Sequence, residues 1–326
     1  MKSEILHILR ERDDYVSGQE LCSLFGVSRT AVWKAIRQLR EEGYEIQAVP
    51  NRGYHITGYP DAVSAQELQS RLSTEWAGRE VVYVPEVDST NHKAKRLAEE
   101  GAGHGTLVVT DWQTQGKGRR GRSWSTPPGT AIAMSVIVRP RMRPEKASML
   151  TLVMGLAVAC ACRSLFGLDA QIKWPNDIVV GGKKLCGILT EMSAEMNEIH
   201  YLVIGTGINV NVETFPQDIC ETATSLCLEL GKKVRRAEVI QASLEHFERF
   251  YDTFMETEDF SKLQKPYNQL LVSRDRQVRV LTPGNEYWGI SRGVNGAGEL
   301  LVEREDGSTE AVYAGEVSVR GIYGYS

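Results

Sequence analysis

A glycine-rich basic segment at positions 116–122 is the first part of the sequence that could do chemistry. Its residues, Gly-Lys-Gly-Arg-Arg-Gly-Arg, comprise three glycines and four cations. Glycine lets the backbone approach a ligand closely, and backbone N–H groups and guanidinium side chains both match phosphate oxygens. The spacing is neither that of a Walker A loop nor that of a Rossmann fingerprint. A phosphate-binding loop and a mobile, solvated basic loop therefore both remain open.

Four further motifs combine polar side chains with turn residues. They are Asp88-Ser-Thr-Asn91, Lys173-Trp-Pro-Asn-Asp177, Gly182-Lys-Lys-Leu-Cys-Gly187 and Gly205-Thr-Gly-Ile-Asn-Val-Asn211. The first three also have purely structural interpretations, as a helix cap, a tight turn and a solvated lysine at the start of a strand. Glycine and asparagine within the last, strand-like motif favour close approach of a ligand.

A basic helix near the N-terminus is a candidate for DNA recognition. Residues 28–40 carry four cations and no acid, although residues 1–60 hold eight basic and eight acidic residues. A recognition helix needs donors near its N-terminus for base edges and cations along it for phosphates. The predicted DNA contacts are Gly18, Ser28, Arg29, Thr30, Trp33, Lys34, Arg37 and Arg52. A single copy offers few phosphate contacts, so useful affinity requires a dimer. A basic face on a protein-interaction module is the alternative.

The elements that must position these residues predict an α+β protein of three domains. Residues 1–60 show helix, helix, turn, helix and hairpin, the order of a winged helix-turn-helix. Residues 64–270 begin with the capping-box pattern Ser64-Ala-Gln-Glu67 and continue as a mixed β-sheet with helices. Strands are expected at 81–87, 106–112, 130–138, 183–192 and 199–211, and helices at 90–100, 146–166 and 236–255. Residues 271–326 contain only short strands, at 277–281, 286–294, 299–303 and 310–319, which predicts a small β-barrel.

Composition limits the classes of protein that the chain can belong to. It has 326 residues, of which 42% are hydrophobic, and a formal net charge of −4. DNA binding must therefore come from a local basic face. The six cysteines form no CxxC pair, which predicts reduced thiols and no metal-ligating residues. The N-terminus lacks the apolar segment of a signal peptide, and Arg163 interrupts the apolar stretch 147–166, so we expect a cytoplasmic protein without membrane contact.

Taken together, the order and spacing of these motifs resemble those of the bacterial biotin–protein ligases. The N-terminal module and the C-terminal strands resemble the bifunctional, DNA-binding members, so the resemblance covers essentially the whole chain. It implies a central domain of the biotin/lipoate ligase type and an SH3-like C-terminal barrel. It also implies that biotin and ATP, with Mg²⁺ on the polyphosphate, give biotinyl-5′-AMP. The biotinyl group then passes to a lysine of a biotin carboxyl carrier domain.

The resemblance assigns roles to individual residues. Those implied in catalysis are Lys184, Arg119 and Asp177. Those implied to hold biotin or its adenylate are Ser89, Thr90, Asn91, Gln113, Gly116, Lys117, Gly118, Arg119, Lys184 and Gly187. Those implied on the nucleotide side are Arg122, Asn176 and Asn209, with the segment 212–224 ordering over the adenine. Family members often carry arginine where this chain has Lys117, which keeps the charge but loses bidentate geometry.

The presence of both activities in one chain predicts regulation. Biotinyl-AMP would act as corepressor and favour a homodimer that pairs two winged helices on operator DNA. Three alternatives remain: a lipoate–protein ligase of related fold, a transcription factor with a degenerate ligase domain as sensor, and a ligase whose winged helix only stabilises the enzyme.

Overall fold

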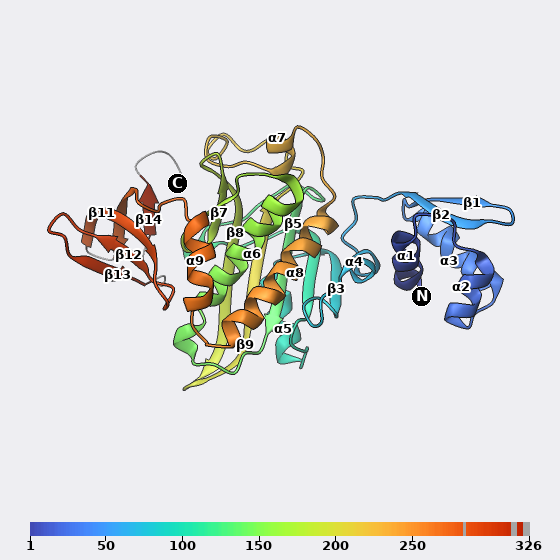
Figure 1. Cartoon of the computed structure of the whole chain (residues 1–326), viewed down its shortest axis with the longest axis horizontal. Coiled ribbons are helices and arrows are strands. Elements are labelled where there is room, and N and C mark those ends of the chain that lie inside the picture. Colours follow the sequence, from blue (N-terminus) through green and yellow to red (C-terminus); the bar gives the residue numbers. More distant parts are fainter. Residues whose placement is uncertain (283–284, 314–317, 322–326) are drawn as a thin grey trace.

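The computed structural model describes residues 1–282, 285–313 and 318–321. A helical module with a small hairpin lies at one end of the molecule, a large sheet with helices forms the middle, and a small antiparallel sheet lies at the other end (Figure 1). The N-terminal module and the C-terminal sheet are therefore separated by the central unit, and each of them contacts it from a different side.

The N-terminal module has the predicted winged helix-turn-helix order. Its elements are α1 (Lys2–Glu11), α2 (Gly18–Phe25), α3 (Arg29–Glu41), β1 (Glu45–Val49) and β2 (Gly53–Gly58). The hydroxyl oxygens of Ser17 and Ser28 accept backbone N–H groups of the first turns of α2 and α3, so local capping fixes both starts. Gly26 ends α2 in the left-handed region, at φ 63°. Apolar side chains from all three helices fill the core of the module.

The central unit is a sheet of seven strands in the order β3-β4-β5-β9-β8-β7-β6, in which β3 and β4 alone are parallel among its described pairings. The strands are β3 (Val81–Val87), β4 (Leu107–Gln113), β5 (Ala131–Val138), β6 (Gln171–Lys173), β7 (Asp177–Val180), β8 (Lys183–Glu195) and β9 (Glu198–Asn209). The helices are α4 (Ala65–Arg71), α5 (Thr90–Glu99), α6 (Met149–Phe166), α7 (Leu226–Leu230), α8 (Arg236–Met255) and α9 (Ser261–Leu270). The mixed sheet with helices is as predicted.

Successive side chains of each strand point to opposite faces of the sheet, which gives two apolar layers. Val108, Ile137 and Val203 pack with α5 on one face, whereas their neighbours in the sequence pack with α6 and α8 on the other face. Helices α6 and α8 run side by side over that face (Figure 1). The segment Pro144–Phe166 is long and apolar enough to cross a membrane, but 67% of its most apolar window is buried inside the protein, as in a core helix.

Several boundaries differ from the prediction. The helix expected from residue 146 begins at Met149, after a 3-10 turn over Pro144–Lys146. The single strand expected at 310–319 is two strands, β13 (Thr309–Val312) and β14 (Ser318–Gly321), separated by residues outside the described ones. With β10 (Gln277–Thr282), β11 (Asn285–Val294) and β12 (Leu300–Glu303) they form an antiparallel sheet in the order β13-β12-β11-β10-β14. The predicted C-terminal all-β unit is thus observed as this five-stranded sheet.

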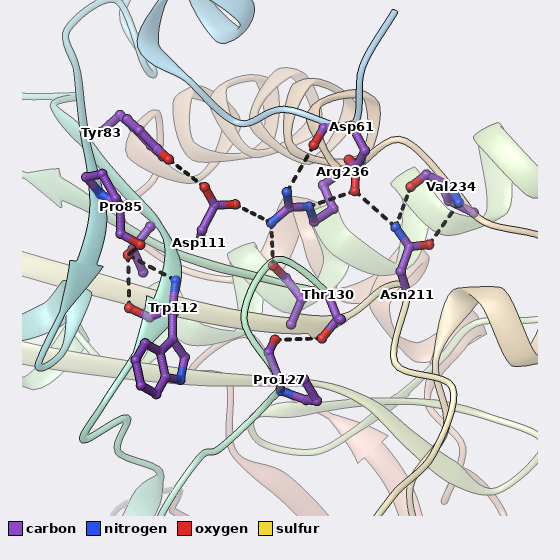
Figure 2. A network of polar contacts seen from close by, with 12 residues as sticks. Asp61, Tyr83, Pro85, Asp111, Trp112, Pro127, Thr130, Asn211, Val234 and Arg236 are labelled. Atoms are coloured by element: carbon purple, nitrogen blue, oxygen red, sulfur yellow. Dashed lines mark hydrogen bonds and ion pairs between the residues drawn. The ribbon is translucent and has the colours of Figure 1, made fainter. Parts of the chain in front are cut away.

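The linker between β2 and α4 is bound tightly to the central unit through Asp61. The Arg236 guanidinium, with its side chain 4% exposed, donates to the Asp61 carboxylate at 3.0 Å and to the Asp111 carboxylate at 2.7 Å. Tyr83 donates its hydroxyl to Asp111, and the Asn211 amide donates to Asp61 at 3.1 Å (Figure 2). Burial, together with the bond to Asp111, raises the pKa of Tyr83 to about 12. The linker is therefore part of a polar network that reaches β4 and the end of β9.

A second buried charge cluster joins the N-terminal module to α4. The Glu67 carboxylate is fully buried; its two oxygens accept Nη2 of Arg10 at 3.0 and 3.1 Å, and it also accepts the Tyr44 hydroxyl at 2.6 Å. Arg71, one turn further along α4, also donates to it. Because Arg10 and Tyr44 belong to the winged helix and Glu67 to α4, this interface is held by hydrogen-bonded ions rather than by apolar packing alone.

Candidate functional site

A hollow opens between the start of α5, the end of β4, the segment after β4, and strands β8 and β9. Ten residues predicted to bind ligand line it: Ser89, Thr90, Asn91, Gln113, Lys117, Gly118, Arg119, Asn176, Lys184 and Gly187. The structure thus gathers in one place residues that are almost 100 positions apart in the sequence.

One wall of the hollow is a closed set of hydrogen bonds at the start of α5. The Gln113 side-chain oxygen accepts the Thr90 backbone N–H at 2.8 Å and the Thr90 hydroxyl at 3.1 Å. The Ser135 hydroxyl lies 2.8 Å from Thr90 Oγ1 and 2.7 Å from Asn91 Oδ1. These side chains are held in fixed rotamers, so they present a rigid polar surface to a ligand.

Asn91 links this wall to the sheet. Its amide nitrogen donates to the Glu191 carboxylate at 2.7 Å and to the Leu189 carbonyl at 3.2 Å. A Cβ at Gly205 would lie 2.1 Å from Asn91 Oδ1, so only glycine permits this approach of α5 to β9. Glu191 also pairs with Lys95. Burial raises the pKa of Glu191, but the bonds from Lys95 and Asn91 outweigh it and leave the pKa below its usual value.

The basic segment 116–122 forms a small hairpin over the hollow. The Gly118 N–H donates to the Arg122 carbonyl at 2.7 Å, and the Trp124 N–H donates to the Gly116 carbonyl at 2.8 Å. Its tip is a 3-10 turn over Arg119–Gly121, in which Arg120 lies in the left-handed region at φ 57°. Gly116 does not line the hollow, but a Cβ there would lie 2.3 Å from the Trp124 carbonyl oxygen, so the hairpin needs a glycine at its base.

The turn at the tip places Arg119 across the hollow. Its guanidinium donates to the Asn176 side-chain oxygen at 3.0 Å. Burial lowers the pKa of Arg119, the adjacent Arg120 lowers it further, and Asp177 opposes both effects. A partly desolvated guanidinium of this kind is suited to an anionic ligand, which would replace the water that it has lost.

Strands β7 and β8 bring a lysine and a carboxylate together at the opposite wall. The Lys184 ammonium lies 2.7 Å from Asp177 Oδ1, and the two side chains are 24% and 11% exposed. Asp177 follows the Trp174-Pro175 bond, which is cis, and the Asn176 amide donates to it at 3.0 Å. Asp177 does not line the hollow itself, but it contacts the Lys184 ammonium that does.

The two other predicted residues outside the lining are Asn209 and Arg122. The Asn209 amide donates to the Thr224 carbonyl at 3.0 Å. The Lys184 N–H donates to the Thr222 carbonyl at 2.8 Å, so the end of the segment 212–224 is attached to the start of β8. Asn209 therefore holds this segment beside Lys184. Arg122 follows the tip of the hairpin and is exposed.

The sequence prediction missed Trp124. Its indole ring covers two glycines of the sheet, because a Cβ would lie 2.7 Å from the ring at Gly207 and 3.3 Å from it at Gly187. The Lys184 ammonium lies 5.7 Å from the ring centroid. The buried indole N–H has no hydrogen-bond partner among the described residues, so it is a donor available to a bound molecule. Two sequence features could have indicated Trp124: it follows the basic segment closely, and glycines at 205 and 207 leave room on a strand for a large ring.

The predicted DNA contacts lie on the exposed face of α3 and on the wing. Arg29, Thr30, Trp33, Lys34 and Arg37 are all exposed. Trp33 is the large apolar side chain among them, and it is 51% exposed. The Cζ atom of Arg37 lies over its indole ring, 5.1 Å from the ring centroid.

Four predicted members are partly used within the module. Ser28 caps α3, Arg29 donates to Gln19 at 2.9 Å, Arg37 pairs with Glu41 at 3.4 Å, and Arg52 of the wing pairs with Asp14 at 2.9 Å. Gly18, at the start of α2, lies against Tyr54 of the hairpin, where a Cβ would make an ordinary contact at 3.6 Å. The face that remains for a partner is therefore centred on Thr30, Trp33 and Lys34.

Comparison with known proteins agrees with this arrangement. Three family models match: an HTH domain at residues 2–55, the biotin/lipoate A/B protein ligase family at 83–209, and the biotin protein ligase C-terminal domain at 275–320. The chain is 38% identical over 309 residues to the bifunctional ligase/repressor BirA of Bacillus subtilis strain 168, and 30% identical over 308 residues to that of Escherichia coli K12. Each alignment covers 94% of both chains.

A similar solved structure is the biotin protein ligase from Aquifex aeolicus in complex with biotin and ATP. It is 30% identical, with a TM-score of 0.66, and the match covers 74% of this chain and 99% of that chain.

Proposed function

Since the chain belongs to the family of bifunctional biotin–protein ligases and biotin repressors, we propose that the hollow described above is its ligase site and that α3 reads operator DNA. The protein activates biotin with ATP to biotinyl-5′-AMP, transfers the biotinyl group to an acceptor lysine, and represses transcription. The observation that carries this conclusion is the 30–38% identity to bifunctional ligase/repressors over 94% of the chain. The convergence of the predicted residues in one hollow supports it independently.

The wall at the start of α5 would hold biotin. The ureido group of biotin carries one carbonyl and two N–H groups, so it needs both donors and acceptors. Ser89, Thr90, Asn91 and Gln113 supply both kinds of group in fixed positions. Trp124 and the glycine surface beneath it, including Gly187, would cover the apolar part of biotin.

The cations on the opposite side would carry the adenylation step. A carboxylate oxygen of biotin attacks the α-phosphorus of ATP, a P–O bond forms, and pyrophosphate leaves with the electrons of the bond that breaks. Negative charge builds up on the phosphorus oxygens, and cations held ready for it stabilise the transition state. Lys184 and Arg119 are the cations placed for this role. Lys117, Gly118 and Arg122 belong to the same hairpin as Arg119, and Asn176 accepts a hydrogen bond from Arg119 across the hollow. Asp177 would orient Lys184 through its ion pair.

Transfer then requires the amine nitrogen of the acceptor lysine to attack the acyl carbon, with AMP as leaving group. Lys184 would again neutralise the departing phosphate. Asn209 and the segment 212–224 would lie on the nucleotide side and shield the mixed anhydride from water. The acceptor would be a biotin carboxyl carrier domain.

Mg²⁺ would enter with the polyphosphate of ATP rather than occupy a site built by the protein. Among residues 1–282, 285–313 and 318–321, no group of three histidine, cysteine or acidic side chains could hold a metal ion. Mg²⁺ commonly keeps several waters and binds substrate phosphates with one or two carboxylates, and Asp177 is the carboxylate beside the site.

We further propose that residues 1–60, 64–270 and 271–326 are the three domains, that the protein acts in the cytoplasm, and that biotinyl-AMP promotes a homodimer. A dimer would present two copies of α3 to two half-sites of an operator. The adenylate would then be both reaction intermediate and corepressor, and its consumption by the acceptor would relieve repression.

Exchange of labelled pyrophosphate into ATP by the purified protein, with biotin or lipoate as the added acid, tests the ligase proposal. We expect exchange with biotin alone. Exchange with lipoate alone would overturn the biotin assignment, and exchange with neither acid would favour a repressor that only senses. Operator binding with and without biotin and ATP tests the regulation. Equal affinity in the two conditions would contradict the corepressor role.

A further inference from the structure

A row of three polar side chains connects α5 to the basic hairpin. His92 lies in the first turn of α5, with its Nδ1 atom 3.1 Å from Asp88 Oδ2. Its other ring nitrogen, Nε2, lies 3.1 Å from the ammonium of Lys117. Lys117 belongs to the first arm of the hairpin, where it pairs with Ser123 of the second arm, and its side chain lines the hollow.

The chemistry of the three groups fixes the direction of both hydrogen bonds. An ionised carboxylate can only accept, so His92 must donate from Nδ1 to Asp88. The Nε2 atom of a neutral imidazole is then an acceptor, and the ammonium of Lys117 is the donor that faces it. Burial raises the pKa of Asp88, but bonds from the Ser89 N–H and from His92 outweigh it and leave the pKa below its usual range. Asp88 is therefore charged and sets the tautomer of His92.

We infer that His92 is a positioning residue of the ligase reaction, which holds Lys117 over the hollow in the orientation that a bound adenylate needs. This inference rests on the proposed function of the hollow, because it assigns Lys117 to the adenylate. An arginine carries a rigid fork of donors, whereas a lysine carries one charged nitrogen on a flexible stem. His92 and Asp88 supply the external constraint that a lysine lacks at this point of the hairpin.

The experiment uses the full chain with His92→Phe, Lys117→Met and the double substitution. Phenylalanine keeps a planar ring but has neither nitrogen. The control is His200→Phe, which changes an exposed histidine of β9 whose Nε2 atom lies 4.0 Å from Glu195 Oε2, away from the hairpin. Two quantities are measured: trypsin cleavage after Arg119, Arg120 and Arg122 in the ligand-free protein, and the rate at which preformed biotinyl-AMP leaves the protein.

We expect His92→Phe to raise both rates about three- to tenfold, the range for one partly exposed hydrogen bond, and His200→Phe to leave them unchanged. The double variant should lose adenylate no faster than Lys117→Met alone, because the two side chains act through one contact.

Additive effects in the double variant, or equal behaviour of His92→Phe and His200→Phe, would overturn the inference. Its failure is distinguishable from failure of the proposed function. If the wild-type protein forms no adenylate, the ligase proposal is wrong, and the trypsin measurement on the ligand-free protein still decides whether His92 holds the hairpin. Unchanged cleavage in His92→Phe would then refute the positioning role.

Discussion

Replacing Arg236 with methionine should destabilise the protein by about 2–4 kcal/mol, a magnitude that follows from its contacts. The guanidinium is almost wholly buried and donates to two carboxylates, those of Asp61 and Asp111. Hydrogen bonds to charged partners contribute roughly 1.5–3 kcal/mol each, which gives about 3–6 kcal/mol for two. The two carboxylates are 32% and 30% exposed, so water can partly replace the arginine after substitution, and the expected loss is lower.

Urea denaturation of the full chain, followed by tryptophan fluorescence and far-UV circular dichroism, measures this loss. The matched control is Arg163→Met, which removes an ion pair with Asp169 in which the side chains are 40% and 74% exposed. An exposed pair of this kind contributes less than about 1 kcal/mol. Hydrogen exchange at residues 58–64 should also become faster in Arg236→Met, because the linker loses its anchor. Equal destabilisation by the two substitutions would refute the reasoning.

Three further predictions follow from the site and the winged helix. Lys184→Met should lower the rate of biotin-dependent pyrophosphate exchange by about 10²–10³-fold, and a loss of less than about tenfold would contradict its role at the phosphate. Glu191 has a pKa below its usual 4.5, despite the opposing effect of burial, because Lys95 and Asn91 donate to it. Its contribution to stability is therefore present above about pH 4.5 and lost as pH falls through the folded-state pKa, so the difference in unfolding free energy between wild type and Glu191→Gln should shrink below about pH 4.5. A constant difference would show that the pairing with Lys95 does not stabilise the fold. Lys34→Gln should weaken operator binding and reduce the slope of log affinity against log salt by about 1, as measured by fluorescence anisotropy, and an unchanged slope would exclude a phosphate contact.

The parts of the fold that could be predicted are those encoded by neighbouring residues. Caps at Ser17, Gly26 and Ser28 fix both ends of α2 and the start of α3, and the structure confirms the winged helix predicted for residues 1–60. Strands β6 and β7 were missed because they have only three and four residues, too few for a periodic pattern. Their register depends on pairing with each other and, for β7, with β8, which local sequence does not encode.

Some residues of the candidate site could be predicted from short sequence motifs, and others could not. Its motifs could be found because glycines and cations cluster in short segments, and most of their members line one hollow. Trp124 was missed because its role depends on Gly187 and Gly207, more than 60 positions away. Glu67 shows the opposite case. The capping-box pattern correctly predicts the start of α4, where Ser64 accepts the Glu67 N–H at 3.3 Å, but the carboxylate of Glu67 binds the winged helix.

The buried carboxylate of Glu67 also constrains how the two activities can be recombined. Arg10 and Tyr44 belong to the winged helix, yet they donate hydrogen bonds to the Glu67 carboxylate, which belongs to α4 of the central unit. A different winged helix grafted at residue 60 would leave that charge without these two donors, unless the new module carried equivalents at both positions. An exchange of winged helices between relatives therefore has to keep the surface with Arg10 and Tyr44 together with the surface with Glu67. Operator specificity can change more readily by substitutions on α3 than by exchange of whole modules.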